Sequence, residues 1–196
     1  MIHYISNRIA SIFVLYGEST EENKDIYTYA IEAVVAVLVN LVVCILISAL
    51  FGRIAEGIIF ITVFALLRRF TGGFHADSHF KCIFTFCVIL TCSLFVLQLY
   101  ESVGFNRLIV PSVATVAWVG ILILAPIIDA NKQHQNESHK KAQRKKIVLV
   151  STFLLILCGV LVFSMNISLA VMLSLSMLSV LGLITCVHLQ RLIGKQ

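Results

Sequence analysis

Long apolar runs, separated by short polar segments, make up most of the sequence. The three clearest runs are Ile31–Phe51, Ile83–Leu97 and Ile147–Met165. A helix needs about 20 apolar residues to cross the hydrocarbon core of a bilayer. A helix on the surface of a soluble protein would carry a polar face, which these runs lack. The pattern therefore predicts membrane-spanning helices.

Polar breaks divide the chain into six predicted spans, at residues 30–51, 57–67, 80–99, 108–128, 147–165 and 167–188. The second span is the shortest, because only the 11 residues Gly57–Leu67 precede a pair of arginines. At 1.5 Å per residue it covers about 17 Å, which is roughly half of the apolar thickness. We therefore expect Arg68 and the residues after it to be recessed below the membrane surface, within protein or a wet cavity.

The first segment of the chain, residues 1–28, is amphipathic rather than uniformly apolar. It is too polar to span a bilayer, so we expect a helix that lies along the membrane surface or packs onto the bundle. The predicted fold is an all-α integral membrane protein with six transmembrane helices preceded by an N-terminal amphipathic helix. It forms a single membrane domain over residues 1–196. The apolar face of the first helix comprises Ile2, Ile5, Ile9, Ile12, Phe13 and Tyr16.

Charge gives this fold an orientation. Only 13% of the residues are charged, against about 25% in soluble proteins, and the net charge is +5. Basic residues gather in the connector 129–146 between the fourth and fifth spans, which predicts that it is cytoplasmic, as are both termini. The connector is polar enough to be flexible and to contact lipid headgroups, and nothing in the chain suggests nucleic-acid binding. Its basic residues are Lys132, Lys140, Lys141, Arg144, Lys145 and Lys146.

The polar segment 68–82 carries the candidate chemistry. A cysteine nucleophile reacts as its thiolate and needs a nearby base. On one straight helix, His75 and Cys82 would lie about 10 Å apart along the axis, too far for proton transfer. Asp77 or Ser78 is a suitable N-cap, so a helix that starts there would put Cys82 in or just beyond its first turn and leave His75 free to fold back. The segment contains Arg68, Arg69, Gly72, Gly73, His75, His79 and Cys82.

Other roles for this segment stay open from the residues alone. His79 lies three residues before Cys82 and is an alternative base. A metal site of His75, His79 and Cys82 lacks a clear fourth ligand other than Asp77, so we expect no metal and no cofactor. Arg68 and Arg69 either mark the cytoplasmic end of a span or hold a substrate carboxylate or the loop itself. The remaining cysteines are interpreted as packing residues: Cys44, Cys87, Cys92, Cys158 and Cys186.

The motif Arg68-Arg69-x-x-Gly72-Gly73-x-His75-Ala76, followed by Cys82, resembles the accessory gene regulator B (AgrB) family. These membrane peptidases process the pheromone precursor AgrD in quorum sensing. The resemblance also covers the chain length, the six spans and Ala125-Pro126, but Gln133 stands where the family often has proline. It implies that Cys82, activated by His75, forms a thioester with an AgrD-like precursor. A cysteine or serine of the precursor then closes a thiolactone or lactone.

Two other classes of function compete with this peptidase. A transporter would carry ionisable residues within its spans, whereas here they lie at span ends and Glu32 comes nearest to an exception. A non-catalytic scaffold would use the 68–82 motif only to stabilise the loop. A homodimer is also left open, because small residues in the sixth span permit close helix packing: Ser174, Ser176, Ser179 and Gly182.

Overall fold

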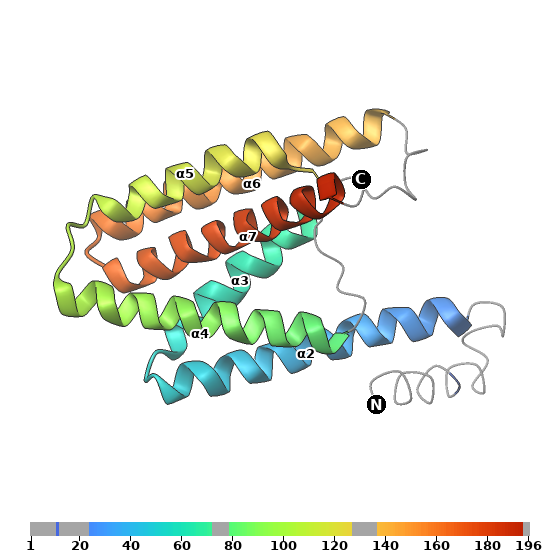
Figure 1. The fold of residues 1–196 in the computed structure, drawn as a ribbon, viewed down its shortest axis with the longest axis horizontal. Helices are drawn as coiled ribbons and strands as arrows, with labels where there is room; N and C mark the ends of the chain where they lie inside the picture. The colour runs from blue at the N-terminus through green and yellow to red at the C-terminus, as the bar shows by residue number, and fades with distance from the viewer. Residues whose placement is uncertain (1–10, 12–23, 72–78, 127–136, 194–196) are drawn as a thin grey trace.

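The computed structural model describes residue 11 and residues 24–71, 79–126 and 137–193, which form helices without any strand (Figure 1). The all-α prediction is therefore confirmed for this part of the chain. The predicted N-terminal amphipathic segment, residues 1–28, lies outside it except for Ser11 and residues 24–28, which form the start of α2. The helices within these ranges are α2 (Lys24–Leu50), α3 (Ile54–Thr71), α4 (His79–Val103), α5 (Ile109–Leu124), α6 (Glu137–Phe163) and α7 (Ile167–Ile193).

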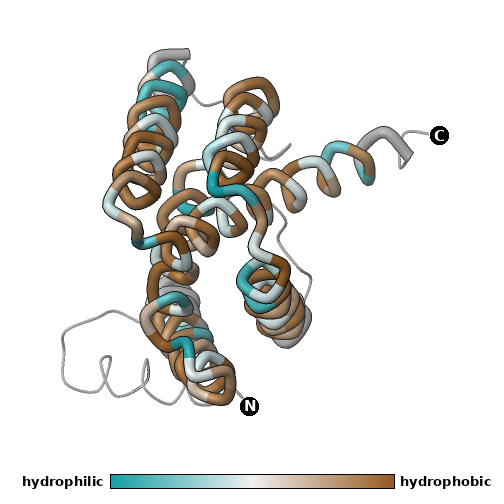
Figure 2. Tube along the Cα trace, turned by 90° about the vertical axis from the view of Figure 1, so that its left-hand side faces the viewer, coloured by the Kyte–Doolittle hydropathy of each residue, from teal (hydrophilic) through white to brown (hydrophobic). Residues whose placement is uncertain are grey.

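Several of these helices have the length and apolarity of membrane spans. Three are long enough to cross a bilayer: Cys82–Val103, Lys141–Phe163 and Ile167–Gln190, and Val37–Leu50 and Ile109–Leu124 are shorter apolar helices. Apolar residues cover the outer as well as the inner faces of the bundle (Figure 2). A surface of this kind is stable in lipid and not in water, so the described helices belong to an integral membrane protein.

Helix α7 forms the centre of the bundle. It packs against α3, α4, α5 and α6, whereas α2 packs against α3 and α4 at the edge (Figure 1). The fully buried Ser176 of α7 donates a hydrogen bond to the carbonyl oxygen of Phe60 in α3, at 3.1 Å. This bond satisfies a polar group that would be costly to bury alone. The largest side chains that α7 buries fully are Met172, Leu173, Met177 and Ile184.

Helices α2 and α3 form a tight hairpin. Gly52 adopts a left-handed backbone (φ +67°) between them, a conformation that glycine reaches without strain. A few residues further on, Gly57 lies so close to α2 that a Cβ atom placed on it would be 1.8 Å from Ser48 Oγ. The Cys44 thiol donates to the Gly57 carbonyl oxygen, with Sγ and O 3.3 Å apart. Side chains of α2 are therefore packed directly against the backbone of α3 at this point.

Four helix boundaries differ from the sequence prediction, namely the ends of α3 and α5 and the starts of α2 and α6. Helix α3 continues past Leu67 to Thr71, since nothing breaks the helix before the following glycines and Thr71 is fully buried. Helix α5 ends at Leu124 rather than near residue 128, because the proline at 126 forces Ala125 into an extended conformation (φ −98°, ψ 152°). The other helix ends agree with the predicted spans to within a few residues, apart from the N-terminal extensions of α2 and α6.

The basic connector is the clearest of these differences. Its second half, 137–146, was expected to be flexible but is the first part of α6. Glutamate, lysine, alanine, glutamine and arginine have high helix propensity, and this stretch consists largely of them. The basic residues from Lys140 to Lys146 therefore lie on a continuous helix that leads directly into an apolar span, whereas Lys132 lies outside the described residues.

Candidate catalytic segment between α3 and α4

The two arginines of the motif lie in the last turn of α3. Arg68 is half-buried, and its Cζ atom lies 5.8 Å from the centroid of the Phe64 ring, within the range of a cation–π contact. Arg69 is exposed. Both charges also suit the negative end of the helix dipole. Arg68 is therefore packed against protein, whereas Arg69 can contact solvent or lipid headgroups.

Cys82 is the fourth residue of α4, which begins at His79. The predicted helix start between Asp77 and Cys82 agrees with this boundary. The backbone N–H groups in a first helical turn have no acceptor within the helix, and they favour negative charge nearby. Cys82 is half-buried, and it belongs to this first turn.

Two phenylalanines hold the ends of α3 and α4 together. Phe64 is one turn before Arg68 on α3, and Phe86 is one turn after Cys82 on α4. Their rings meet edge to face with centroids 5.6 Å apart, and both side chains are buried. Such pairs stabilise by about 0.5–1.5 kcal/mol beyond their burial. This contact has no signal in the sequence, because the two aromatic residues occupy ordinary positions within apolar runs.

Helix α6 also reaches this site. The Gln143 side chain donates from Nε2 to the carbonyl oxygen of Phe70, at 3.0 Å. That carbonyl belongs to the last turn of α3, where backbone acceptors lack partners within the helix. The assignment of the amide nitrogen is chemically required, because a carbonyl oxygen accepts only from a donor. A glutamine within a run of lysines gave no sign of this role in the sequence.

The ends of these helices gather at one end of the bundle. Figure 1 shows that α3 and α7 end where α4 and α6 begin. Gly72, Gly73 and His75, like Asp77 and Ser78, lie outside the described residues. The approach of His75 to Cys82 therefore stays a prediction. Arg68, Arg69 and Cys82 are brought to the same end of the molecule as the basic start of α6.

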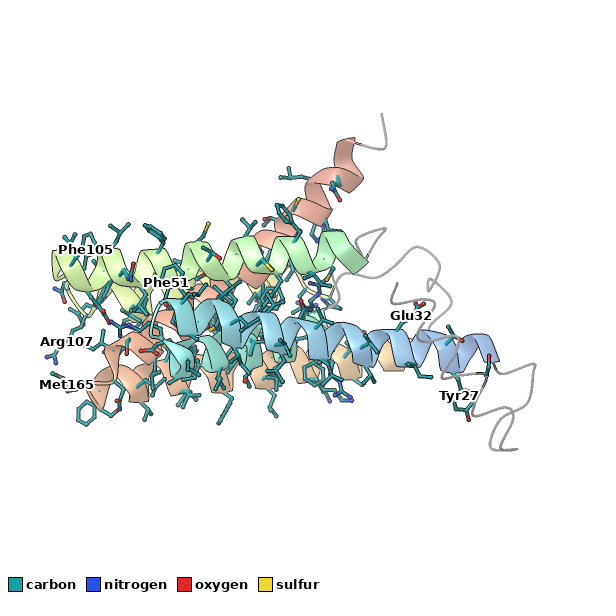
Figure 3. The ribbon with its side chains drawn as sticks, turned by 90° about the horizontal axis from the view of Figure 1, so that it is seen from below. Tyr27, Glu32, Phe51, Phe105, Arg107 and Met165 are labelled. Atoms are coloured by element: carbon teal, nitrogen blue, oxygen red, sulfur yellow. The ribbon has the colours of Figure 1, made fainter. Side chains whose placement is uncertain are left out.

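A second polar cluster lies at the opposite end of the bundle. Arg53, in the α2–α3 turn, contacts Glu56 Oε1 at 3.2 Å and also pairs with Glu101 of α4. Burial lowers the pKa of Arg53, but the two carboxylates more than reverse this effect, so its pKa is raised. Figure 3 shows Arg107 and Met165 at this same end, far from Tyr27 and Glu32. The cluster ties α2, α3 and α4 together away from the candidate site.

Two of the other cysteines support the packing interpretation. Cys44 and Cys158 are fully buried, and each donates to a backbone carbonyl, of Gly57 and Ala170 respectively. Cys87 is half-buried, and Cys92 and Cys186 are exposed on helices. Among the described residues, no three His, Cys, Asp or Glu side chains stand close enough to hold a metal ion. Two of the ligands considered for a metal, His75 and Asp77, lie outside that set.

A family model described as accessory gene regulator B matches residues 6–185, which include the whole of segment 68–82. The chain belongs to the AgrB family. AgrB-like protein 2 of Clostridium perfringens (strain 13, type A) is 28% identical over 184 residues, covering 89% of this chain and 86% of that protein. An AgrB-like protein of Clostridium perfringens (strain SM101, type A) is 29% identical over 163 residues, covering 79% and 76%. No solved structure matches the chain.

AgrB membership confirms the resemblance that the 68–82 motif indicated. The AgrB family is a peptidase family, so membership implies a role in processing a peptide pheromone for quorum sensing, with an AgrD-like precursor as the substrate. The individual roles of Cys82, His75, the arginines and the glycines do not follow from membership alone.

Proposed function

We propose that this AgrB protein is a cysteine endopeptidase of the cell membrane that cleaves an AgrD-like precursor and promotes its cyclisation. The observation that carries the proposal is the family match across segment 68–82. The position of Cys82 in the first turn of α4 supports it, because backbone N–H groups without acceptors in the helix are suited to bind a developing oxyanion there. In the proposed topology six helices span the membrane, both termini are cytoplasmic, and an amphipathic N-terminal helix precedes the bundle.

The proposed reaction proceeds by acyl transfer. His75 takes the proton of the Cys82 thiol, and the sulfur attacks a backbone carbonyl of the precursor. The C–N bond breaks, the imidazolium protonates the departing amine, and an acyl thioester remains on Cys82. A thiol or hydroxyl of the precursor then attacks this thioester, which closes the ring and frees Cys82. Backbone N–H groups at the start of α4 are suited to stabilise the oxyanion in both steps.

The remaining motif residues serve the same site in this proposal. Arg68 and Arg69 hold the loop or a substrate carboxylate, and arginine suits this role because its planar fork binds carboxylates through two hydrogen bonds. Gly72 and Gly73 permit the backbone to fold sharply between α3 and α4. A thioester must be kept from water until the ring closes, which a recessed site would achieve. No cofactor takes part.

The test is precursor cleavage by purified protein in vesicles. We expect Cys82→Ala to abolish cleavage and thioester formation while the protein still inserts and folds. The matched control is Cys87→Ala, another half-buried cysteine of α4, which should cleave normally. Normal processing by Cys82→Ala would rule out the proposed nucleophile.

The same assay identifies the base. His75→Ala should lose cleavage, whereas His79→Ala should retain most of it. The opposite result would assign the proton transfer to His79 and leave the nucleophile in place. Loss of activity in both variants would indicate that one imidazole positions the other.

A further inference from the structure

A groove of about 790 Å³ runs along one exposed face of α6. Its lining residues recur every three or four positions, so they share one side of the helix. Cationic residues line the end nearest the candidate site, and apolar residues line the rest. The lining consists of Lys141, Arg144, Lys145, Val148, Leu149, Thr152, Phe153 and Ile156.

We propose that this groove is a binding site for one anionic glycerophospholipid. The phosphate lies against Lys141, Arg144 and Lys145, and an acyl chain follows the apolar part of the groove toward Ile156. The match in charge carries the proposal. The helical segment 137–146 contains five Lys or Arg and one Glu, which gives it a net charge of +4 (5 − 1) with histidine neutral.

The dimensions of the groove fit a lipid in one leaflet. From Lys145 to Ile156 is 11 residues, or about 17 Å along the axis at 1.5 Å per residue. One leaflet contributes half of the roughly 30 Å hydrocarbon core, or about 15 Å. When the headgroup lies at the basic end, the acyl chain therefore lies along the apolar part of the groove over most of the leaflet.

The apolar part of the groove offers an acyl chain an uncovered surface. Leu149, Phe153 and Ile156 are each 60% exposed or more, so no described helix covers them. The side-chain oxygen in this part of the groove belongs to Thr152, and it accepts a hydrogen bond from Trp118 Nε1 of α5 at 3.2 Å. The other side chains of this part of the groove, Val148, Leu149, Phe153 and Ile156, are hydrocarbon, which suits an acyl chain.

The pattern is more specific than a general excess of positive charge on one side of the membrane. Lys146 belongs to the same basic run and is exposed, but it does not line the groove. If the basic residues acted only through topology or a diffuse surface potential, Arg144 and Lys146 would be equivalent. Comparing variants at Arg144 and Lys146 therefore distinguishes a defined binding site from a general electrostatic attraction.

The fluorescence of Trp118 can report on what occupies the groove. Trp118 is the one tryptophan in the chain, and its indole contacts a residue of the groove wall. Brominated acyl chains quench tryptophan fluorescence at short range. We would reconstitute the full chain in vesicles of phosphatidylcholine that contain brominated phosphatidylglycerol, and compare them with vesicles that contain brominated phosphatidylcholine at the same mole fraction.

We expect the anionic brominated lipid to quench Trp118 more strongly at equal mole fraction. Arg144→Gln should weaken this preference about fivefold, the effect of removing one cation near an anionic headgroup, and Lys146→Gln should leave it unchanged. Equal quenching by the two lipids, or equal effects of the two variants, would overturn the proposal. Weak quenching by both lipids that strengthens on dilution of the protein would instead assign the groove to a second copy of the chain and would equally overturn it.

Discussion

Replacing Gly57 with alanine tests whether α2 and α3 approach as closely as the structure indicates. A Cβ atom on Gly57 would lie 1.8 Å from Ser48 Oγ and 2.7 Å from Ser48 Cβ. The hydroxyl can rotate away, but the Cβ atom is fixed to the backbone. Restoring an ordinary contact of 3.4 Å requires the helices to separate by about 0.7 Å (3.4 − 2.7). That shift would also stretch the hydrogen bond from Cys44 to the Gly57 carbonyl.

The expected magnitude follows from a matched control. Overpacking of this kind costs about 1–3 kcal/mol, while alanine gains up to about 1 kcal/mol over glycine in a helix. Gly159 of α6 is also helical, and a Cβ atom there would meet nothing within 4 Å. Gly159→Ala gains the same helix propensity without the clash. The Gly57→Ala protein should therefore be less stable than the Gly159→Ala protein by about 1–3 kcal/mol.

The assay is equilibrium unfolding of each purified variant in the same detergent micelles. Ser48→Gly supplies an internal check, because it removes the two atoms with which the new methyl group would clash and leaves only the ordinary contact with Cys44 Sγ at 3.5 Å. Combined with Gly57→Ala, it should recover most of the lost stability, and a double-mutant cycle measures that coupling. If Gly57→Ala were as stable as Gly159→Ala, the close approach of α2 and α3 described here would be refuted.

The Gln143–Phe70 hydrogen bond and the Arg53–Glu56 ion pair can be tested in the same way. Gln143→Ala removes the donor to the Phe70 carbonyl, so hydrogen exchange in the last turn of α3 should accelerate about 2–10-fold, as expected for a bond of about 0.5–1.5 kcal/mol. Gln143→Lys, which keeps a donor, should restore slow exchange. Arg53→Gln leaves the buried Glu56 without its cation and should destabilise the protein by about 1–3 kcal/mol, measured by unfolding in micelles. Arg107 donates to the Met165 thioether sulfur, so Arg107→Gln should destabilise the protein less. Because the pKa of Arg53 is raised, its contribution is fully present at neutral pH and would be lost only in strong alkali.

The apolar pattern predicted the helices well because their ends are marked locally. Asn166 is the single residue between the predicted spans 147–165 and 167–188, and α7 begins at Ile167 with Met165 in a left-handed conformation (φ 61°). Pro126 ends α5 earlier than the apolar run predicts, because the run itself continues to residue 128. The start of α6 is polar like a loop, but its residues have high helix propensity, and the propensity decides its structure.

The candidate site was predictable only in part. The cap before Cys82 is a local signal, and the start of α4 at His79 agrees with it. The contacts that organise the site join residues far apart in the sequence, such as Phe64 with Phe86 and Phe70 with Gln143. No periodicity within one segment encodes which helices become neighbours. The sequence therefore indicated the motif but not the helices that hold it.

The central position of α7 has a consequence for biogenesis. It is the last of the described helices to leave the ribosome, yet α3, α4, α5 and α6 all pack against it. Before its synthesis the earlier helices share a bilayer without their common partner, and Ser176 is not yet available to Phe60. Final assembly must therefore follow insertion of the last helix, and a nascent chain halted before residue 167 would remain an open set of spans, exposed to quality-control proteases.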